Sequence, residues 1–136
     1  MTRPRSFRFA ASLLAALEAR ARERGESASA VAQRYLEEGL RRDTHPLIVF
    51  RDGAAGRRPA LAGTRVDVAQ VIETLRNSDN SIDETSEYLA LPEAYVRAAV
   101  KYYADYKDEI DEWRERMRSI AEREEEAWKR EQAVLA

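Results

Sequence analysis

The sequence predicts a mainly α-helical fold with short strands. Apolar residues recur at helical spacing over residues 11–24 and again over residues 29–40. Two short apolar runs separated by glycines, residues 47–50 and 58–61, are typical of a strand hairpin. From Pro92 onward no residue breaks a helical pattern. These observations divide the chain into three predicted domains, residues 1–44, 45–105 and 106–136.

The composition favours a cytoplasmic protein that binds other macromolecules. The 136 residues include no cysteine and one histidine, which excludes disulfides and the usual zinc sites, so we expect no metal and no cofactor. No apolar run approaches the ~20 residues needed to span a membrane. Residues 1–45 carry nine arginines against six acidic residues, whereas residues 77–136 carry nine basic and sixteen acidic residues. The basic N-terminal residues fit binding to nucleic acid, and the acidic C-terminal residues fit binding to a basic protein. Ordinary solvated surface charge gives the same asymmetry.

The first element is a short strand, because residues 7–9 alternate apolar, polar and apolar. Such a strand is too short to be stable alone, and its simplest partner is the same strand of a second copy. The result is a two-stranded antiparallel ribbon in a homodimer. Phe7 and Phe9 should face the helices, while Ser6 and Arg8 face outward.

Two amphipathic helices follow the strand. The first is predicted from Ala11 to Arg24 and ends at Gly25, with an apolar stripe of Leu13, Leu14, Leu17 and Ala21. The second begins at Ser27 or Ser29, either of which can cap it. Its predicted buried face consists of Val31, Tyr35, Leu36 and Leu40. Residues 43–46 read as a linker.

Capping signals place the helices of the middle domain. Asp67 and Gln70 form a capping box for a helix over residues 68–76. Ser81 and Glu84 form a second one, which opens a short helix ending near Leu89. From Pro92 we expect one long helix that outruns its domain, with an apolar stripe of Val96, Val100, Tyr103, Ile110, Trp113, Met117 and Ile120.

The predicted ribbon suits DNA, because a two-stranded ribbon fits the major groove. Arg8 can donate two hydrogen bonds to guanine, and Ser6 can bond to several bases. Phosphates can be contacted by Arg3 and Arg5 at the ribbon entrance and by the start of the second helix, at Ser27 and Ser29.

Residues 4–42 resemble the ribbon-helix-helix family of bacterial repressors and VapB-like antitoxins. The resemblance rests on the Phe-Arg-Phe strand, the leucine-rich first helix, Gly25 and the Ser-Ala-Ser helix start at residues 27–29. It implies a homodimer in which Ser6 and Arg8 read bases. Arg5 departs from the family, which often has an apolar residue there. A plain helical hairpin with a frayed N-terminus is the alternative.

Residues 46–105 resemble a small bacterial family known as domain of unknown function 433. The resemblance rests on residues 58–66, which end in Gly-Thr-Arg-Val, and on the helices that follow. It implies a hairpin with a helix-turn-helix-like core, and frequent association with toxin–antitoxin operons. We expect that core to serve packing and dimerisation, because its candidate recognition helix is weakly charged. A secondary basic patch for DNA is expected at Arg57, Arg58 and Arg65.

The C-terminal segment carries large apolar residues among many charges, and exposed tryptophans are good interface anchors. The resemblance implies that it blocks a toxin, for which we expect a PIN-type ribonuclease. The expected toxin-binding residues are Trp113, Arg114, Met117, Arg118, Ile120 and Trp128. A self-associating coiled coil is the alternative.

Together these features predict a type II antitoxin that represses its own operon as a dimer or higher oligomer and neutralises a toxin. A stand-alone dimeric regulator, whose C-terminal helix only oligomerises, is the alternative, and a structural module without a DNA role is a third possibility. We expect no enzyme, because no nucleophile, base and orienting group converge. His45 lies in a Thr-His-Pro segment, where a solvated or capping histidine is expected.

Overall fold

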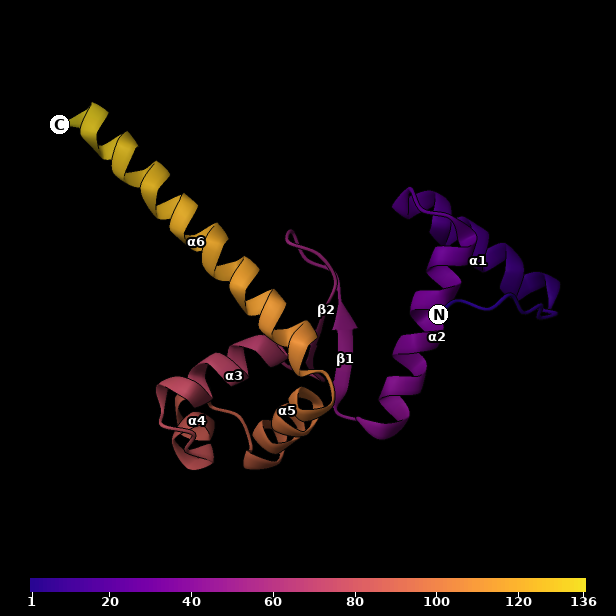
Figure 1. The fold of residues 1–136 in the computed structure, drawn as a ribbon, viewed down its shortest axis with the longest axis horizontal. Coiled ribbons are helices and arrows are strands. Elements are labelled where there is room, and N and C mark those ends of the chain that lie inside the picture. The colour runs from indigo at the N-terminus through magenta and orange to yellow at the C-terminus, as the bar shows by residue number, and fades with distance from the viewer. The chain divides into compact units, whose positions relative to one another are not determined.

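The computed structural model describes all 136 residues, which form two compact units, residues 1–44 and residues 45–136 (Figure 1). The first unit contains helices α1 (Ala11–Arg24) and α2 (Ala28–Thr44). The second contains a two-stranded antiparallel hairpin and four helices, of which the last is long. Every helix in the chain is too short or too polar to cross a membrane.

The boundaries of the first two helices follow from their caps. Gly25 adopts a left-handed conformation with φ of 65°, and its N–H donates to the carbonyl of Arg22, which confirms the predicted end of α1. The hydroxyl of Ser27 accepts the N–H of Ala30 at 3.1 Å, so Ser27 and not Ser29 caps α2. The prediction that the linker begins at residue 43 is wrong, because α2 continues through Thr44. The signal that ends the helix is Pro46, because a proline disfavours the helical conformation of the residue before it, here His45.

The first unit leaves most of its apolar residues exposed. Its only fully buried helical residues are Ala21 and Val31. Of the predicted buried face of α2, only Val31 is covered in the single chain, and half of the apolar stripe of α1 is exposed as well. The exposed ones are Leu13, Leu14, Tyr35, Leu36 and Leu40. Two helices packed on each other can cover only the residues between them.

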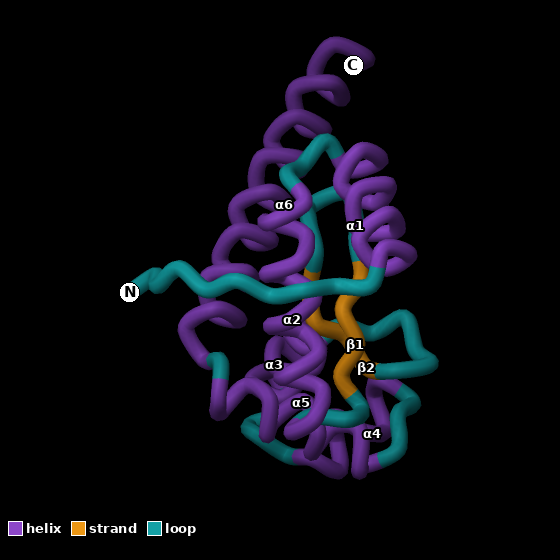
Figure 2. The backbone as a smooth tube through the Cα atoms, turned by 90° about the vertical axis from the view of Figure 1, so that its right-hand side faces the viewer, coloured by secondary structure: helices purple, strands orange, loops and turns teal.

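Residues 1–10 have no regular secondary structure and run as an extended loop (Figure 2). The rings of Phe7 and Phe9 are 64% and 40% exposed, so neither contributes to a core. The two rings stack with centroids 6.3 Å apart, which places them on one side of the backbone as in a strand. A strand needs hydrogen bonds to a second strand, and the single chain offers none to this segment. The ribbon and the dimer stay predictions.

The second unit begins with strands β1 (Ile48–Arg51) and β2 (Arg58–Leu61), paired so that Ile48 lies opposite Leu61. The bounds of β2 are as predicted, and β1 is shifted by one residue. Helix α3 (Val68–Asn77) carries the predicted capping box. The Asp67 carboxylate accepts the Gln70 N–H, and the Gln70 side chain accepts the Asp67 N–H, both at 2.8 Å.

Helices α4 (Ile82–Leu89) and α5 (Glu93–Asp105) complete the predicted domain. The Ser81 hydroxyl caps α4 by accepting the N–H of Glu84 at 3.1 Å. Apolar side chains from the hairpin and the helices form one core, whose fully buried members include Ile48, Leu61, Val68, Val71, Ile72, Val96, Ala99 and Tyr102.

The prediction of one long helix from Pro92 is wrong. Tyr106, with φ of −130° and ψ of 42°, separates α5 from α6 (Lys107–Leu135), and α6 leaves in a new direction (Figure 1). The Tyr106 ring packs on Tyr102, with centroids 4.6 Å apart. The break lets Ile110 and Trp113, 1% and 9% exposed, join the core of the second unit. The first turns of α6 therefore belong to the fold, and only its far half projects.

Candidate functional site

The N-terminal segment presents its polar side chains to solvent. Arg3, Arg5, Ser6 and Arg8 are all exposed, and none of the three arginines forms an ion pair within the chain. Because Phe7 and Phe9 stack on one side, an extended backbone places Ser6 and Arg8 on the other side. The segment thus offers uncommitted guanidinium groups, which bind phosphates and guanine edges.

The start of α2 offers backbone donors in addition. The first turn of α2 contains no acidic residue, and Ser29 is exposed. Ser27 uses its hydroxyl to accept the N–H of Ala30, which leaves the N–H groups of Ala28 and Ser29 without an acceptor in the chain. Free N–H groups at the positive end of a helix suit a phosphate oxygen.

The predicted secondary basic patch is mostly neutralised. Arg57 pairs with Asp52 at 3.2 Å, and Arg58 pairs with Asp67, also at 3.2 Å. Only Arg65 is exposed without a partner; it follows Thr64, whose hydroxyl donates to the Leu61 carbonyl at 2.9 Å. A site of three free cations is therefore absent. The patch reduces to one arginine on a turn.

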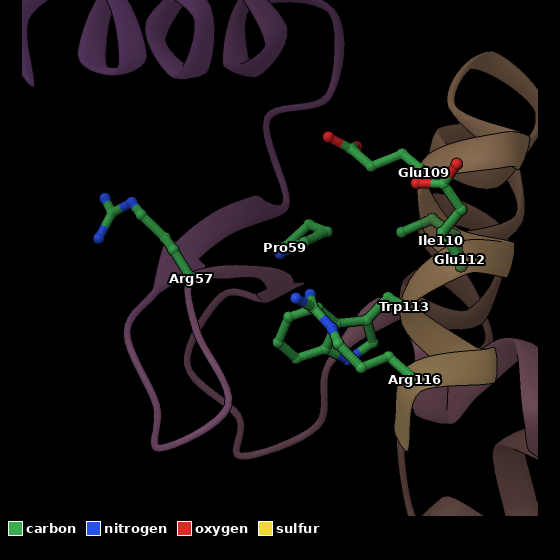
Figure 3. A pocket seen from close by; sticks show the side chains of 7 residues that line it. All are labelled: Arg57, Pro59, Glu109, Ile110, Glu112, Trp113 and Arg116. Carbon is green, nitrogen blue, oxygen red and sulfur yellow. The ribbon is translucent and has the colours of Figure 1, made fainter. Parts of the chain in front are cut away.

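The prediction that Trp113 faces solvent is wrong, because the residue is buried. It closes a pocket of about 360 Å³ between the hairpin and α6, with the guanidinium of Arg116 4.5 Å from the centre of its ring (Figure 3). The lining residues are Arg57, Pro59, Glu109, Ile110, Glu112, Trp113 and Arg116. Two arginines and two glutamates balance each other there, so the lining carries no net formal charge.

Arg114 holds α6 against α3. Its Nε atom donates to Oε2 of Glu73 at 2.9 Å, its Nη2 atom lies 2.8 Å from the same oxygen, and its Nη1 atom donates to Asp111 at 3.1 Å. Arg118 is more exposed and pairs with Glu115 at 2.9 Å. Arg114 is thus committed within the fold, and a partner's carboxylate would have to displace Glu73.

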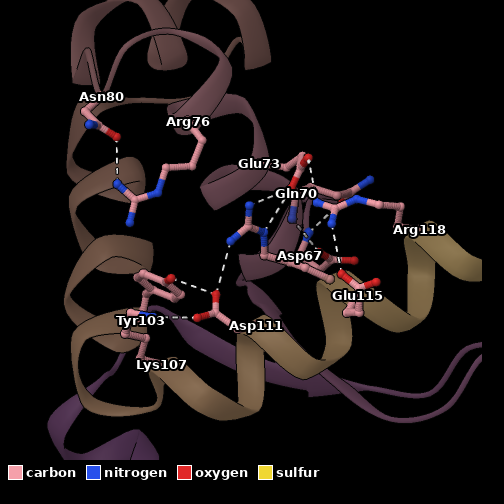
Figure 4. Close-up of polar contacts among 11 residues, drawn as sticks. Asp67, Gln70, Glu73, Arg76, Asn80, Tyr103, Lys107, Asp111, Glu115 and Arg118 are labelled. Atoms are coloured by element: carbon pink, nitrogen blue, oxygen red, sulfur yellow. Dashed lines mark hydrogen bonds and ion pairs between the residues drawn. The ribbon is translucent and has the colours of Figure 1, made fainter.

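Asp111 is the centre of the same network. Its carboxylate accepts the Tyr103 hydroxyl at 2.7 Å and the Lys107 ammonium at 2.6 Å (Figure 4). These hydrogen bonds, from Lys107 first and Tyr103 second, lower the pKa of Asp111 to about 2. They also raise the pKa of Lys107. Asp111 therefore ties α6 to α5 through Tyr103, and its contacts are strongest while its carboxylate is ionised.

This network predicts an acid-sensitive stability. Because the pKa of Asp111 is about 2 in the fold and higher in the unfolded chain, the unfolded chain binds more protons between these values. The contribution of Asp111 to the free energy of unfolding is present at neutral pH and is lost as the pH falls from about 4 to about 2. Thermal melting of wild type and Asp111→Asn should show a wild-type advantage at pH 6 that is much smaller at pH 2. An equal advantage at both pH values would contradict this role.

The other expected partner-binding residues lie along α6 with increasing exposure. Met117 and Ile120 are half-buried, and Trp128 is 58% exposed. Met117 also borders a second pocket, of about 400 Å³, between α3 and α6. Trp128 is therefore the large anchor that remains available on this helix.

His45 is buried, which contradicts the expectation of a solvated side chain. It is 4% exposed, its Nε2 lies 2.8 Å from Oδ2 of Asp105, and its ring contacts Tyr102 edge-on with centroids 5.1 Å apart. No sequence signal links residues sixty positions apart. No group of three or more metal-ligating side chains gathers here or elsewhere in the chain.

Comparison with known families identifies one domain. Residues 48–103 match the family described as "Protein of unknown function (DUF433)", in agreement with the resemblance seen in the sequence. The chain thus contains a DUF433 domain, formed by the hairpin, α3, α4 and most of α5. Searches of curated proteins and of solved structures found no match.

Proposed function

We propose that the chain is a type II antitoxin. In this proposal it binds operator DNA as a homodimer through residues 1–44, represses its own operon, and neutralises a partner toxin, a PIN-type ribonuclease, through α6. The observation that carries the proposal is the uncovered apolar face of α1 and α2, which belongs to the same unit as the three unpaired arginines of residues 1–10.

The exposed apolar residues support the dimer. A unit of 44 residues with two fully buried helical side chains has too small a core to be stable alone. A second copy would cover the leucines of α1 and α2 and would supply a strand partner to residues 7–9. Both needs are met by one symmetric interface.

The polar side of residues 1–10 supports DNA as the ligand. In the paired ribbon, Arg8 and Ser6 of both copies would lie on one face, opposite the phenylalanines. Arg3, Arg5 and the start of α2 would contact phosphates on either side. This division of contacts gives both sequence readout and salt-dependent affinity.

Arg8→Ala is therefore expected to weaken operator binding by at least about thirtyfold, because the dimer loses two bidentate base contacts of about 1–3 kcal/mol each. A gel shift on the DNA upstream of the chain's own gene measures it. Arg22→Ala removes an exposed arginine on α1 and serves as the matched control. Equal binding by wild type and Arg8→Ala would rule out readout by the ribbon.

The far half of α6 supports contact with a second protein. Deleting residues 121–136 should abolish neutralisation of the protein encoded beside this gene, because it removes Trp128. Folding and DNA binding should persist, since Ile110 and Trp113 stay in place. A deletion from residue 106 would instead remove core side chains. Growth assays with the neighbouring gene induced, together with gel shifts, separate an antitoxin from a stand-alone regulator, whose truncation would leave growth unchanged.

A further inference from the structure

Helix α6 uses one apolar face along its whole length. Ile110, Trp113 and Met117 follow one another at spacings of three and four residues, and the same face continues through Ile120, Ala127, Trp128, Val134 and Leu135. In the first half this face packs into the core of the second unit. In the second half it is uncovered, with Trp128, Val134 and Leu135 58%, 84% and 78% exposed.

Two carboxylates interrupt the uncovered half. Glu124 lies one turn after Ile120 and one turn before Trp128, and Glu131 lies between Trp128 and Leu135 on the same face. Neither glutamate forms an ion pair within the chain, and Lys129 pairs with Glu125 at 3.2 Å. The exposed face therefore alternates apolar and acidic positions, with the acids uncommitted.

We infer that residues 120–135 dock into an apolar groove of a different protein. The partner's groove places one lysine or arginine opposite Glu124 and another opposite Glu131. The inference rests on the proposed function, in which α6 meets a partner, and it names the chemistry of that partner's surface. Charge complementarity carries it, because carboxylates in the middle of a docked face need cations to replace their water.

A second copy of the chain fits this face poorly. In a parallel, in-register pair of helices, Glu124 and Glu131 occupy equivalent seam positions one heptad apart, and each meets its own counterpart. Like charges facing each other destabilise such a pair. The glutamates thus disfavour parallel self-pairing, while the neighbouring Trp128 and Leu135 still require cover.

The test uses the full chain and two synthetic helical peptides of about three heptads with a leucine face. One peptide carries lysine at the two seam positions opposite Glu124 and Glu131, and the other carries glutamate there. We expect the lysine peptide to bind at least about tenfold more tightly, measured by fluorescence anisotropy. Glu124→Gln/Glu131→Gln should abolish this preference. Glu122→Gln/Glu126→Gln removes the same charge outside the apolar face and should keep it.

Three results would overturn the inference: equal binding of both peptides, no binding of the lysine peptide, or a preference that both double variants lose equally. Sedimentation of the chain alone tests the alternative that a second copy binds this face. Dimers or tetramers that depend on Trp128 would show that the partner is a second copy. The protein encoded beside the gene is tested separately. If it fails to bind while the lysine peptide binds as expected, the toxin assignment falls and the chemistry of the face stands.

Discussion

Replacing Trp113 with alanine is expected to lower the free energy of unfolding of the second unit by about 3–5 kcal/mol, the range for removing a buried tryptophan. The side chain is 9% exposed, packs in the same core as Ile110, and stacks with Arg116. Its removal leaves a cavity between the hairpin and α6 that the backbone of Gly56 cannot fill. Urea denaturation followed by far-UV circular dichroism measures the loss.

The same change at Trp128 is the matched control. Trp128 is 58% exposed on the same helix, so Trp128→Ala should change stability by no more than about 0.5 kcal/mol. Partner binding should show the reverse order, with Trp128→Ala defective while it is fully folded. Comparable destabilisation by both variants would mean that the far half of α6 is packed against something in the free protein.

Local chemical signals made much of the fold predictable. Gly25 marks the end of α1 because only a residue tolerant of positive φ can turn the chain there. Asp67 and Gln70 mark the start of α3 because their side chains satisfy each other's backbone N–H groups. Each of these signals lies within four residues, so no knowledge of the tertiary structure is needed to read it.

The errors concern residues whose environment is set by distant partners. Tyr106 has no property of a helix breaker, yet α5 ends there, and its ring packs on Tyr102 and His45. That break moves Trp113 from an expected interface into the core. Arg114 is also predicted at an interface, but it is held within the fold because its ion-pair partner Glu73 lies on α3. Periodicity identified the apolar face of α6 correctly, but not the point at which the domain stops covering it.

Replacing Leu36 and Leu40 together with lysine is the second large expected effect, and it tests the dimer directly. The two side chains are 53% and 70% exposed in the single chain, where lysine would change stability by no more than about 0.5 kcal/mol each. In a homodimer that covers them, an unpaired buried charge costs about 3–5 kcal/mol, so the dissociation constant should rise by more than about a hundredfold. Sedimentation equilibrium should show wild-type dimers and Leu36→Lys/Leu40→Lys monomers.

The conservative pair Leu36→Met/Leu40→Met keeps apolar volume and should remain dimeric. Operator binding should follow the oligomeric state, because one copy cannot form the ribbon: the lysine variant should lose it and the methionine variant should retain it. Helix content by circular dichroism separates loss of the dimer from loss of the helices. If the lysine variant sediments as a dimer, the exposed leucines are not the dimer interface. The proposed ribbon, and with it the proposed DNA-binding face, would then have no support from the exposed apolar residues.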